Sequence, residues 1–166
     1  MTNQELIQKY PFLQVTNPYG PGNWTDCWLD DLEPGWRIAF GEQLCEELSQ
    51  AIKADNCEDR FEILEIKEKY AGLRLYAIGC GPETEKVIAK YEELSKYICG
   101  TCGQVATKIT LGWYYPVCDN CKNYKGSAKP IWEWYGFKSQ EDLEQEIKNI
   151  KNNFRYERYR RVIKCE

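Results

Sequence analysis

The sequence contains no histidine. The imidazole side chain is the usual general base in enzymes and the commonest metal ligand in proteins, so Ser-His-Asp and Cys-His mechanisms are excluded for this chain acting alone. Long apolar runs are missing as well, since no stretch approaches the roughly 20 residues that a membrane-spanning helix needs. The opening residues MTNQELIQKY also lack the basic and apolar regions of a signal peptide. We therefore expect a cytoplasmic protein.

Cysteine and aromatic residues are abundant instead. Nine cysteines and an aromatic content of 14% stand in a chain of 166 residues. Its 43% of hydrophobic residues is close to the globular average, so we expect one ordinary domain with at most a small appendage. An odd number of cysteines in a reducing compartment favours metal binding over disulfides. The aromatic side chains fit core packing first, and interfaces or base stacking second.

Four of the cysteines form two Cys-x-x-Cys pairs, Cys99 with Cys102 and Cys118 with Cys121, and 15 residues lie between the pairs. This spacing is typical of a four-cysteine zinc site, in which each pair wraps a tight turn around the ion. The intervening stretch QVATKITLGWYYPV predicts two short strands around Gly112. We therefore expect a zinc ribbon. Four thiolates leave no coordination position for water, so the Zn²⁺ is expected to be structural.

The alternatives for these four cysteines are two disulfides, an iron–sulfur cluster and a redox-active motif. Disulfides conflict with a reducing cytoplasm, and a redox Cys-x-x-Cys normally occurs singly. The spacing gives less support to an iron–sulfur cluster. The other cysteines are scattered, and we expect them to be small core residues or inert thiols: Cys27, Cys45, Cys57, Cys80 and Cys165.

Hydrophobic periodicity predicts both helices and strands. Residues 34–55 carry an apolar side chain at every fourth position from Trp36 to Ile52, which indicates an amphipathic helix of about five turns. Residues 60–79 alternate apolar and charged side chains around a tight Ala-Gly pair, as the strands of an antiparallel hairpin do. Further helices are expected from capping signals at Thr2 with Glu5, at Pro82 and at Ser139.

These segments predict an α+β fold, in which a small antiparallel sheet packs with helices and a four-cysteine zinc ribbon is added. We divide the chain into an α+β core (residues 1–98), the ribbon (residues 99–122), and an aromatic linker with a basic C-terminal helix that packs on the core (residues 123–166). The apolar pattern of that last helix extends past Phe154 toward Val162.

Several phrases of the sequence occur together in a known order. They are YPFL, NWT, DDLEPGWRIAFGEQLCEEL, EILEIKEKYAGLRLY and CGTCG followed by GWYYPVCDNC. This order resembles a family of uncharacterised phage and prophage proteins, which share a D-D-hydrophobic-Pro-x-Gly-Trp helix start, an IKEKxGxLRxY hairpin and a terminal zinc-ribbon-like pair. The resemblance covers residues 10–122, and the tail lies outside it.

The resemblance implies a setting and no mechanism, since the family has no established activity. Small accessory phage proteins often act against host defence. We therefore expect a protein of the bacterial host's cytoplasm that blocks a defence protein or sequesters its nucleotide signal, an expectation that rests on association.

The predicted hairpin carries basic and aromatic side chains that can form a ligand site. On a two-residue period Lys67 and Lys69 share a face, and so do Arg74 and Tyr76 on the partner strand. Such a face can hold a phosphate and stack a base. The alternative is a solvated face balanced by the neighbouring glutamates. We add Trp36 and Arg37 to the candidate ligand site, although Arg37 can also form an ion pair with Asp30 or Asp31.

The C-terminal segment FRYERYRRVIK is a second basic cluster. A helix would display Arg155, Arg158, Arg161 and Lys164 on one side, where they can contact a partner or a nucleic-acid backbone. The alternative is a basic helix end that complements the helix dipole or docks on the acidic first half of the chain. An isoelectric point near 5.1 argues against a dedicated nucleic-acid binder.

Three hypotheses about function remain. The first is a non-enzymatic phage accessory protein with structural zinc that captures a defence protein or a nucleotide. The second is a nucleic-acid-binding regulatory protein that uses the ribbon and the basic tail. The third is a metal-dependent nucleotide hydrolase that uses Mg²⁺ held by Asp30, Asp31 and Glu33, although three acids before a helix more often serve as caps.

Overall fold

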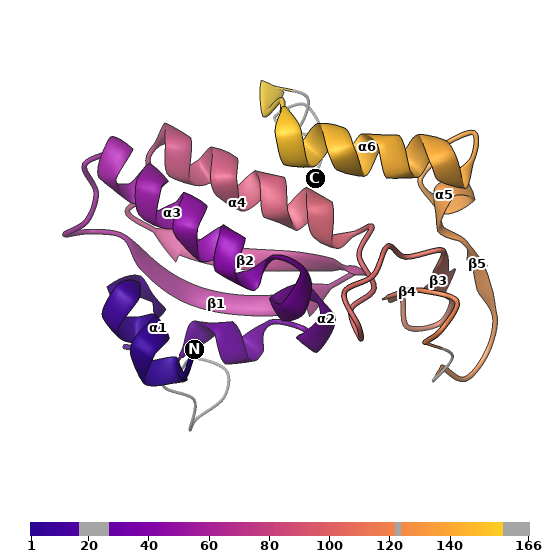
Figure 1. The fold of residues 1–166 in the computed structure, drawn as a ribbon, viewed down its shortest axis with the longest axis horizontal. Helices are drawn as coiled ribbons and strands as arrows, with labels where there is room; N and C mark the ends of the chain where they lie inside the picture. The colour runs from indigo at the N-terminus through magenta and orange to yellow at the C-terminus, as the bar shows by residue number, and fades with distance from the viewer. Residues whose placement is uncertain (17–26, 122–123, 158–166) are drawn as a thin grey trace.

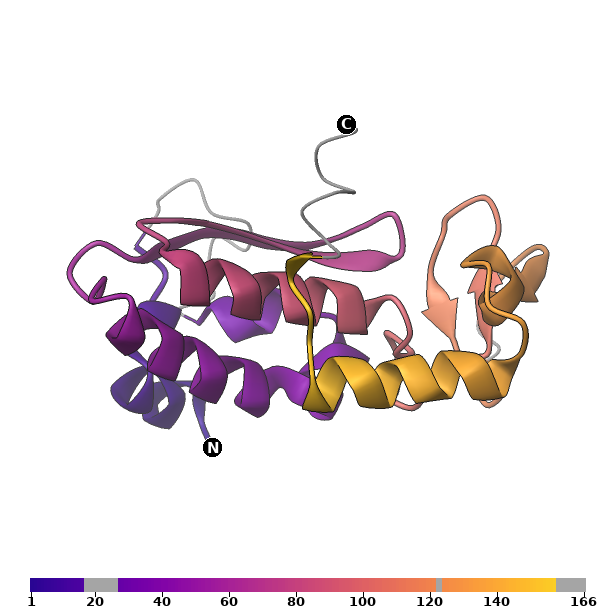
Figure 2. The ribbon, with the colours of Figure 1, turned by 90° about the horizontal axis from the view of Figure 1, so that it is seen from above.

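The computed structural model describes residues 1–16, 27–121 and 124–157. A long antiparallel hairpin, β1 (Glu62–Lys69) and β2 (Gly72–Ile78), carries α4 (Pro82–Ser95) on β2, with α3 (Glu42–Ala54) beside α4 (Figures 1 and 2). The predicted α+β class is therefore confirmed. No helix in these described ranges is both long and apolar enough to cross a bilayer.

The shorter elements complete the core. They are α1 (Asn3–Lys9), η1 (Pro11–Leu13) and η2 (Trp28–Asp31), of which η1 and η2 contact β1. Thr2 and Glu5 form the predicted capping box of α1. At the other end, α6 (Gln140–Asn152) contacts α4 with its C-terminal part, reaches toward the ribbon and buries Leu143, Ile147 and Ile150 (Figure 2).

The helix predicted over residues 34–55 forms, but it is not a regular α-helix throughout. It consists of α2 (Pro34–Trp36), a π-helical turn η3 (Arg37–Gly41) and α3. In an α-helix of 3.6 residues per turn, a four-residue apolar spacing drifts by roughly 40° at each step. A π turn takes up one extra residue and returns the stripe toward the core, so Trp36 and Ile52 are both buried.

The hairpin turns one residue earlier than predicted. Tyr70 and Ala71 occupy the turn with φ values of +52° and +66°, and Gly72 already pairs with Lys69 in the strand ladder. The Ala71 N–H donates to Oε1 of Glu68 at 2.8 Å, which holds this left-handed conformation in place of a glycine. The hairpin tip carries the exposed ring of Tyr70.

The outer edge of β2 is closed by side chains of α4. The N–H of Leu73 donates to Oγ of Ser95 at 2.7 Å, and the N–H of Leu75 donates to Oε1 of Glu92 at 3.0 Å. An edge strand with free N–H groups invites a further strand, and these contacts remove two of them. The core sheet therefore ends at two strands.

We expect Glu92→Gln to stabilise the protein at pH 7 and to lose this advantage as the pH falls toward 4. Burial raises the pKa of the Glu92 carboxyl, against the smaller lowering effects of the Leu75 N–H and Arg74. A raised folded-state pKa gives stability that is complete below the unfolded pKa and is lost as the pH rises through the folded value. Glutamine keeps the acceptor for Leu75 without the charge. Urea midpoints at both pH values measure the difference.

The control for this substitution is Ser95→Ala. It leaves the Leu73 N–H without its partner and is expected to cost about 1–3 kcal/mol at both pH values. A Glu92→Gln protein that loses equal stability at pH 7 and pH 4 would show that the charge of Glu92 is not the unfavourable element.

The ribbon sheet has three strands in the order β4-β3-β5, where the sequence predicts two. It contains β3 (Lys108–Thr110), β4 (Pro116–Val117) and β5 (Ala128–Pro130), all antiparallel. The sequence pattern places residues 128–130 in a linker, yet they pair with β3. Strands on both sides of the predicted boundary at residues 122–123 therefore belong to one sheet.

The segment after β5 joins the ribbon to the core. Ile131, the first residue of α5 (Ile131–Trp134), is fully buried, and its N–H donates to the Thr107 carbonyl at 3.0 Å. Ser139 caps α6 as predicted and accepts from the N–H of Asp142. The helix ends at Asn152, earlier than the apolar pattern suggested.

Candidate metal centre

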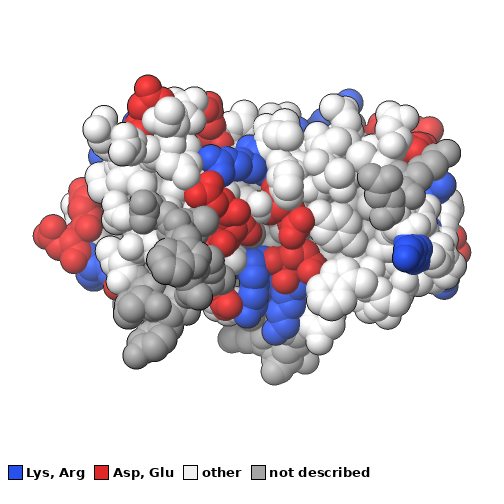
Figure 3. Space-filling view, turned by 90° about the horizontal axis from the view of Figure 1, so that it is seen from below, with Lys and Arg blue, Asp and Glu red and all other residues white. Residues whose placement is uncertain are grey.

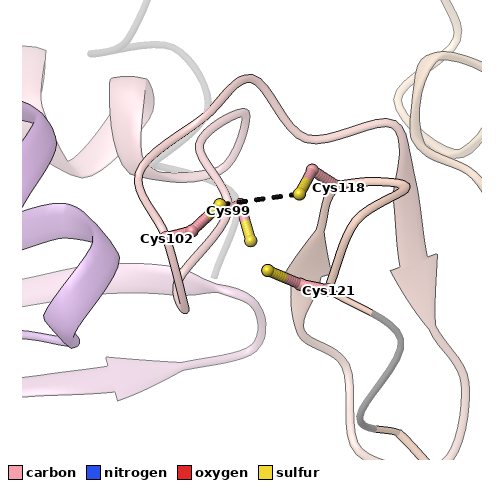
Figure 4. Close-up of side chains that lie close together, drawn as sticks. All are labelled: Cys99, Cys102, Cys118 and Cys121. Carbon is pink, nitrogen blue, oxygen red and sulfur yellow. Dashed lines mark hydrogen bonds between the residues drawn. The ribbon is translucent and has the colours of Figure 1, made fainter.

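The four cysteines of the predicted zinc motif come together beside the ribbon strands (Figure 4). Their sulfur atoms all lie within 4.8 Å of one another, and the Sγ atoms of Cys102 and Cys118 are 3.5 Å apart. Thiolates bound to one tetrahedral zinc ion at about 2.3 Å are separated by roughly 3.8 Å, whereas a disulfide needs about 2.05 Å. The spacing therefore suits one shared metal ion.

The backbone of the first Cys-x-x-Cys pair prepares a sulfur for metal binding. The N–H of Gly103, which has a φ of +82°, donates to the Cys99 carbonyl at 3.0 Å and closes a tight turn. Burial opposes ionisation of the Cys99 thiol, but N–H donors from Cys102, Cys118 and Thr101 outweigh it, and the pKa falls to about 7. The turn thus favours the thiolate that a metal requires.

The start of α2 is anchored on this turn by contacts between backbones. The N–H of Gly35 donates to the carbonyl of Gly100 at 2.7 Å. A Cβ atom on Gly35 would lie only 2.1 Å from the Cys99 carbonyl oxygen and 2.6 Å from the nitrogen of Gly103. No side chain fits between these two segments. Sequence reasoning missed this role of Gly35, because Pro-Gly at a helix start signals only a turn.

Trp36 belongs to the same anchor, so its prediction as a ligand-binding residue is wrong. The residue has 0% exposure, and its indole Nε1–H donates to the carbonyl of Ile98 at 3.0 Å. A second link comes from the ribbon, where the hydroxyl of Tyr115 donates to Oε2 of Glu33 at 2.6 Å. Both contacts hold the Cys-x-x-Cys turn against the core, and they leave no Trp36 surface for a ligand.

The cations of the hairpin have partners within the chain. Lys67 forms an ion pair with Glu65 at 2.8 Å and lies 5.2 Å from the ring centre of Tyr76. Lys69 lies over the ring of Tyr70, and Arg74 donates from Nη1 to the Leu73 carbonyl. Lys67 and Arg74 are direct neighbours across the strands. Figure 3 shows the charges of both signs interleaved over the core, the balanced face that the sequence offered as the alternative.

Arg37 and the acidic residues before α2 also have separate partners. Asp30 accepts from Arg37 at 2.5 Å and from Asn3 at 2.7 Å, while Glu33 accepts from Tyr115. Oδ2 of Asp31 is buried without a hydrogen-bond partner, and this burial raises the pKa of its carboxyl. Within residues 1–16, 27–121 and 124–157, the four cysteines are the one group of three or more potential ligands close enough for a metal.

The basic C-terminal cluster is only partly described. Arg155 lies beyond Asn152, where α6 ends, so it is not displayed on that helix as predicted. Arg158, Arg161 and Lys164 fall outside the described residues.

Aromatic side chains gather on the ribbon, a feature that sequence reasoning did not single out. Trp113 is 75% exposed, and the exposed rings of Tyr114 and Trp134 lie 5.2 Å apart. The signal was present in the GWYY phrase, where Gly112 with a φ of +93° marks the turn and Trp113 follows it. The aromatic excess of the composition therefore has an exposed part beside the metal centre.

No protein-family model matches the chain. No curated protein shows a similar sequence, and no solved structure shows a similar fold. What this protein does must therefore be argued from the metal centre and the surfaces around it.

Proposed function

We propose that this chain is a non-enzymatic binding protein whose fold is held by one structural zinc ion. The four-thiol cluster carries the proposal. Four thiolates in tetrahedral reach close the coordination shell, which is the arrangement of structural rather than catalytic zinc. Zinc also suits an all-sulfur set of ligands, and the spacing leaves room for a single ion.

The chemistry of the remaining residues supports a binding role. The chain has no histidine to act as a general base. Burial raises the pKa of the Cys45 thiol to about 12 and that of Cys80 to about 11, so neither is a ready nucleophile. The separate partners of Asp30 and Glu33 remove the main support for the hydrolase hypothesis.

The partner belongs to the same proposal. Exposed tryptophan and tyrosine side chains on a rigid ribbon are suited to capturing another molecule. The resemblance to phage proteins supports action in the cytoplasm of a bacterial host, against a defence protein or its nucleotide signal. A nucleic-acid-binding role is the second candidate, because exposed rings beside lysines also suit single strands.

Native mass spectrometry of protein purified from cells tests the proposal, with a denatured sample for comparison. We expect one zinc ion per chain that is lost on denaturation, and no turnover of nucleoside triphosphates with added Mg²⁺ or Mn²⁺. Absence of metal, or iron in its place, would remove the structural-zinc part. Turnover that survives repurification would restore the hydrolase hypothesis.

A further inference from the structure

A hollow in the ribbon, next to the metal centre, has the lining of a small ligand site. Its volume is about 300 Å³, at the lower end of the range for small-molecule pockets. It lies between the β3–β4 turn and the residues Tyr124 and Lys125. Three aromatic residues, one lysine and two threonines are among its lining residues: Trp113, Tyr115, Tyr124, Lys125, Thr101 and Thr110.

The Trp113 ring is held in place while most of its surface stays open. The residue is 75% exposed, yet its carbonyl accepts from the Thr110 hydroxyl at 2.5 Å, which fixes the turn. Burial raises the pKa of the neighbouring Glu68 carboxyl, and a hydrogen bond from the Trp113 indole opposes this only in small part. A fixed aromatic ring loses little conformational entropy when a planar group stacks on it.

Lys125 supplies the charge at this hollow. Its side chain is exposed, and no ion pair binds it within the part of the chain that the structure describes. Residues 99–138 contain five lysines and two acidic residues, in contrast to the acidic remainder of the chain. Figure 3 shows a largely uncharged surface over the ribbon.

A larger hollow of about 470 Å³ borders the π turn, but it is less suited to a charged ligand. Its arginine, Arg37, is already neutralised by Asp30 at 2.5 Å. The exposed Ile38 at its rim offers no stacking surface. The ribbon hollow is therefore the better site, although it is the smaller of the two.

We propose that the ribbon hollow binds a nucleobase with its adjoining phosphate, the base stacked on Trp113 and the phosphate held by Lys125. This inference rests on the proposed binding function and names the ligand chemistry for it. A free nucleotide and a single-stranded nucleic acid both present this chemistry. Stacking tolerates every base because each has a π face, so little sequence preference is expected.

The test titrates ATP and UTP by tryptophan fluorescence, and a labelled single-stranded oligothymidylate by anisotropy. Trp113→Ala is expected to weaken binding about 5- to 100-fold, the usual range for loss of one base stack. Lys125→Glu is also expected to weaken binding, and this loss should grow as the salt concentration is lowered, since repulsion of the phosphate replaces attraction. Both changes are at exposed positions, so the zinc content and the melting temperature should stay at wild-type values.

The ribbon offers a matched control for each variant. Trp134→Ala removes an exposed tryptophan, and Lys129→Glu reverses an exposed lysine, yet neither residue lines the hollow. Both should leave nucleotide binding unchanged. If the natural ligand is a single-stranded nucleic acid, Lys129→Glu should weaken binding of the oligothymidylate and leave ATP and UTP binding unchanged. Removal of one lysine–phosphate contact should also lower the slope of log affinity against log salt concentration by about 0.7.

Failure of this inference differs from failure of the proposed function. The nucleobase site is overturned if zinc-loaded, folded protein binds neither the nucleotides nor the oligothymidylate. It is also overturned if the Trp113→Ala and Trp134→Ala variants bind these ligands with equal affinity. Either result leaves the surface to a protein partner. Protein without zinc, or with turnover, overturns the proposed function itself.

Discussion

Cys99→Ser is expected to abolish zinc binding and to unfold the ribbon together with part of the core. Structural zinc in small domains contributes apparent binding free energies of about 10–16 kcal/mol, and loss of one of four thiolates removes much of this. Cys99 is also fully buried, so serine leaves a polar hydroxyl at the position of a sulfur of the four-thiol cluster. We expect a loss of zinc from the purified protein and a melting temperature lower by more than 10 °C, roughly the effect of several kcal/mol.

The damage should extend beyond the ribbon because the two parts share one core. Ala106, Ile109 and Ile131 from the ribbon and its flank lie in the same buried cluster as Trp36 and Ile98. Once the Cys-x-x-Cys turn opens, these apolar side chains lose their cover. A zinc chelator should reproduce the effect in the wild-type protein, and the Trp36 and Trp28 environment will report it by near-ultraviolet circular dichroism.

Cys80→Ser is the matched control for this experiment. Cys80 is a half-buried cysteine outside the four-thiol cluster, so its substitution should keep one zinc ion per chain. If Cys99→Ser retained zinc and melted like the control, the four cysteines would not be the structural metal site.

The parts of the fold that the sequence predicted depend on neighbours along the chain. The alternation of residues 60–79 gave the hairpin, the Cys-x-x-Cys spacing gave the thiol cluster, and the caps at Thr2 and Ser139 gave two helix starts. In each case the decisive interaction joins residues a few positions apart or follows a fixed period. Such patterns are visible in the residue letters.

The parts that escaped prediction depend on distant neighbours. β5 has only three residues and becomes a strand because β3 lies beside it. The π turn forms because the apolar side chains at every fourth position from Trp36 to Ile52 must all stay in contact with the core. The sequence offered both an ion pair with Asp30 and a ligand-binding role for Arg37, and only the folded chain shows that Arg37 contacts Asp30 and also Asn3 of α1. Pairing of this kind is decided by tertiary structure.

Gly35→Ala separates these two levels of explanation, because local and tertiary physics predict opposite signs. In a helix, alanine is favoured over glycine by about 1 kcal/mol, so propensity alone predicts stabilisation at the start of α2. In the folded protein the new Cβ would meet the Cys99 carbonyl oxygen at 2.1 Å and the Gly103 nitrogen at 2.6 Å. Both are backbone atoms, so no side-chain rotation relieves the clash.

We therefore expect Gly35→Ala to destabilise the protein by about 3 kcal/mol or more, with a melting temperature lower by roughly 6–12 °C for a chain of this size. Gly41→Ala is the matched control, since its Cβ would meet Arg37 Cγ at 3.4 Å and Leu32 Cδ1 at 3.9 Å, which is ordinary contact. It should be neutral or slightly stabilising. If Gly35→Ala behaved like Gly41→Ala, the close approach of α2 to the Cys-x-x-Cys turn would not be required. A large loss at Gly35 alone, accompanied by weaker zinc retention, would mean that the core helix and the metal centre form one cooperative unit.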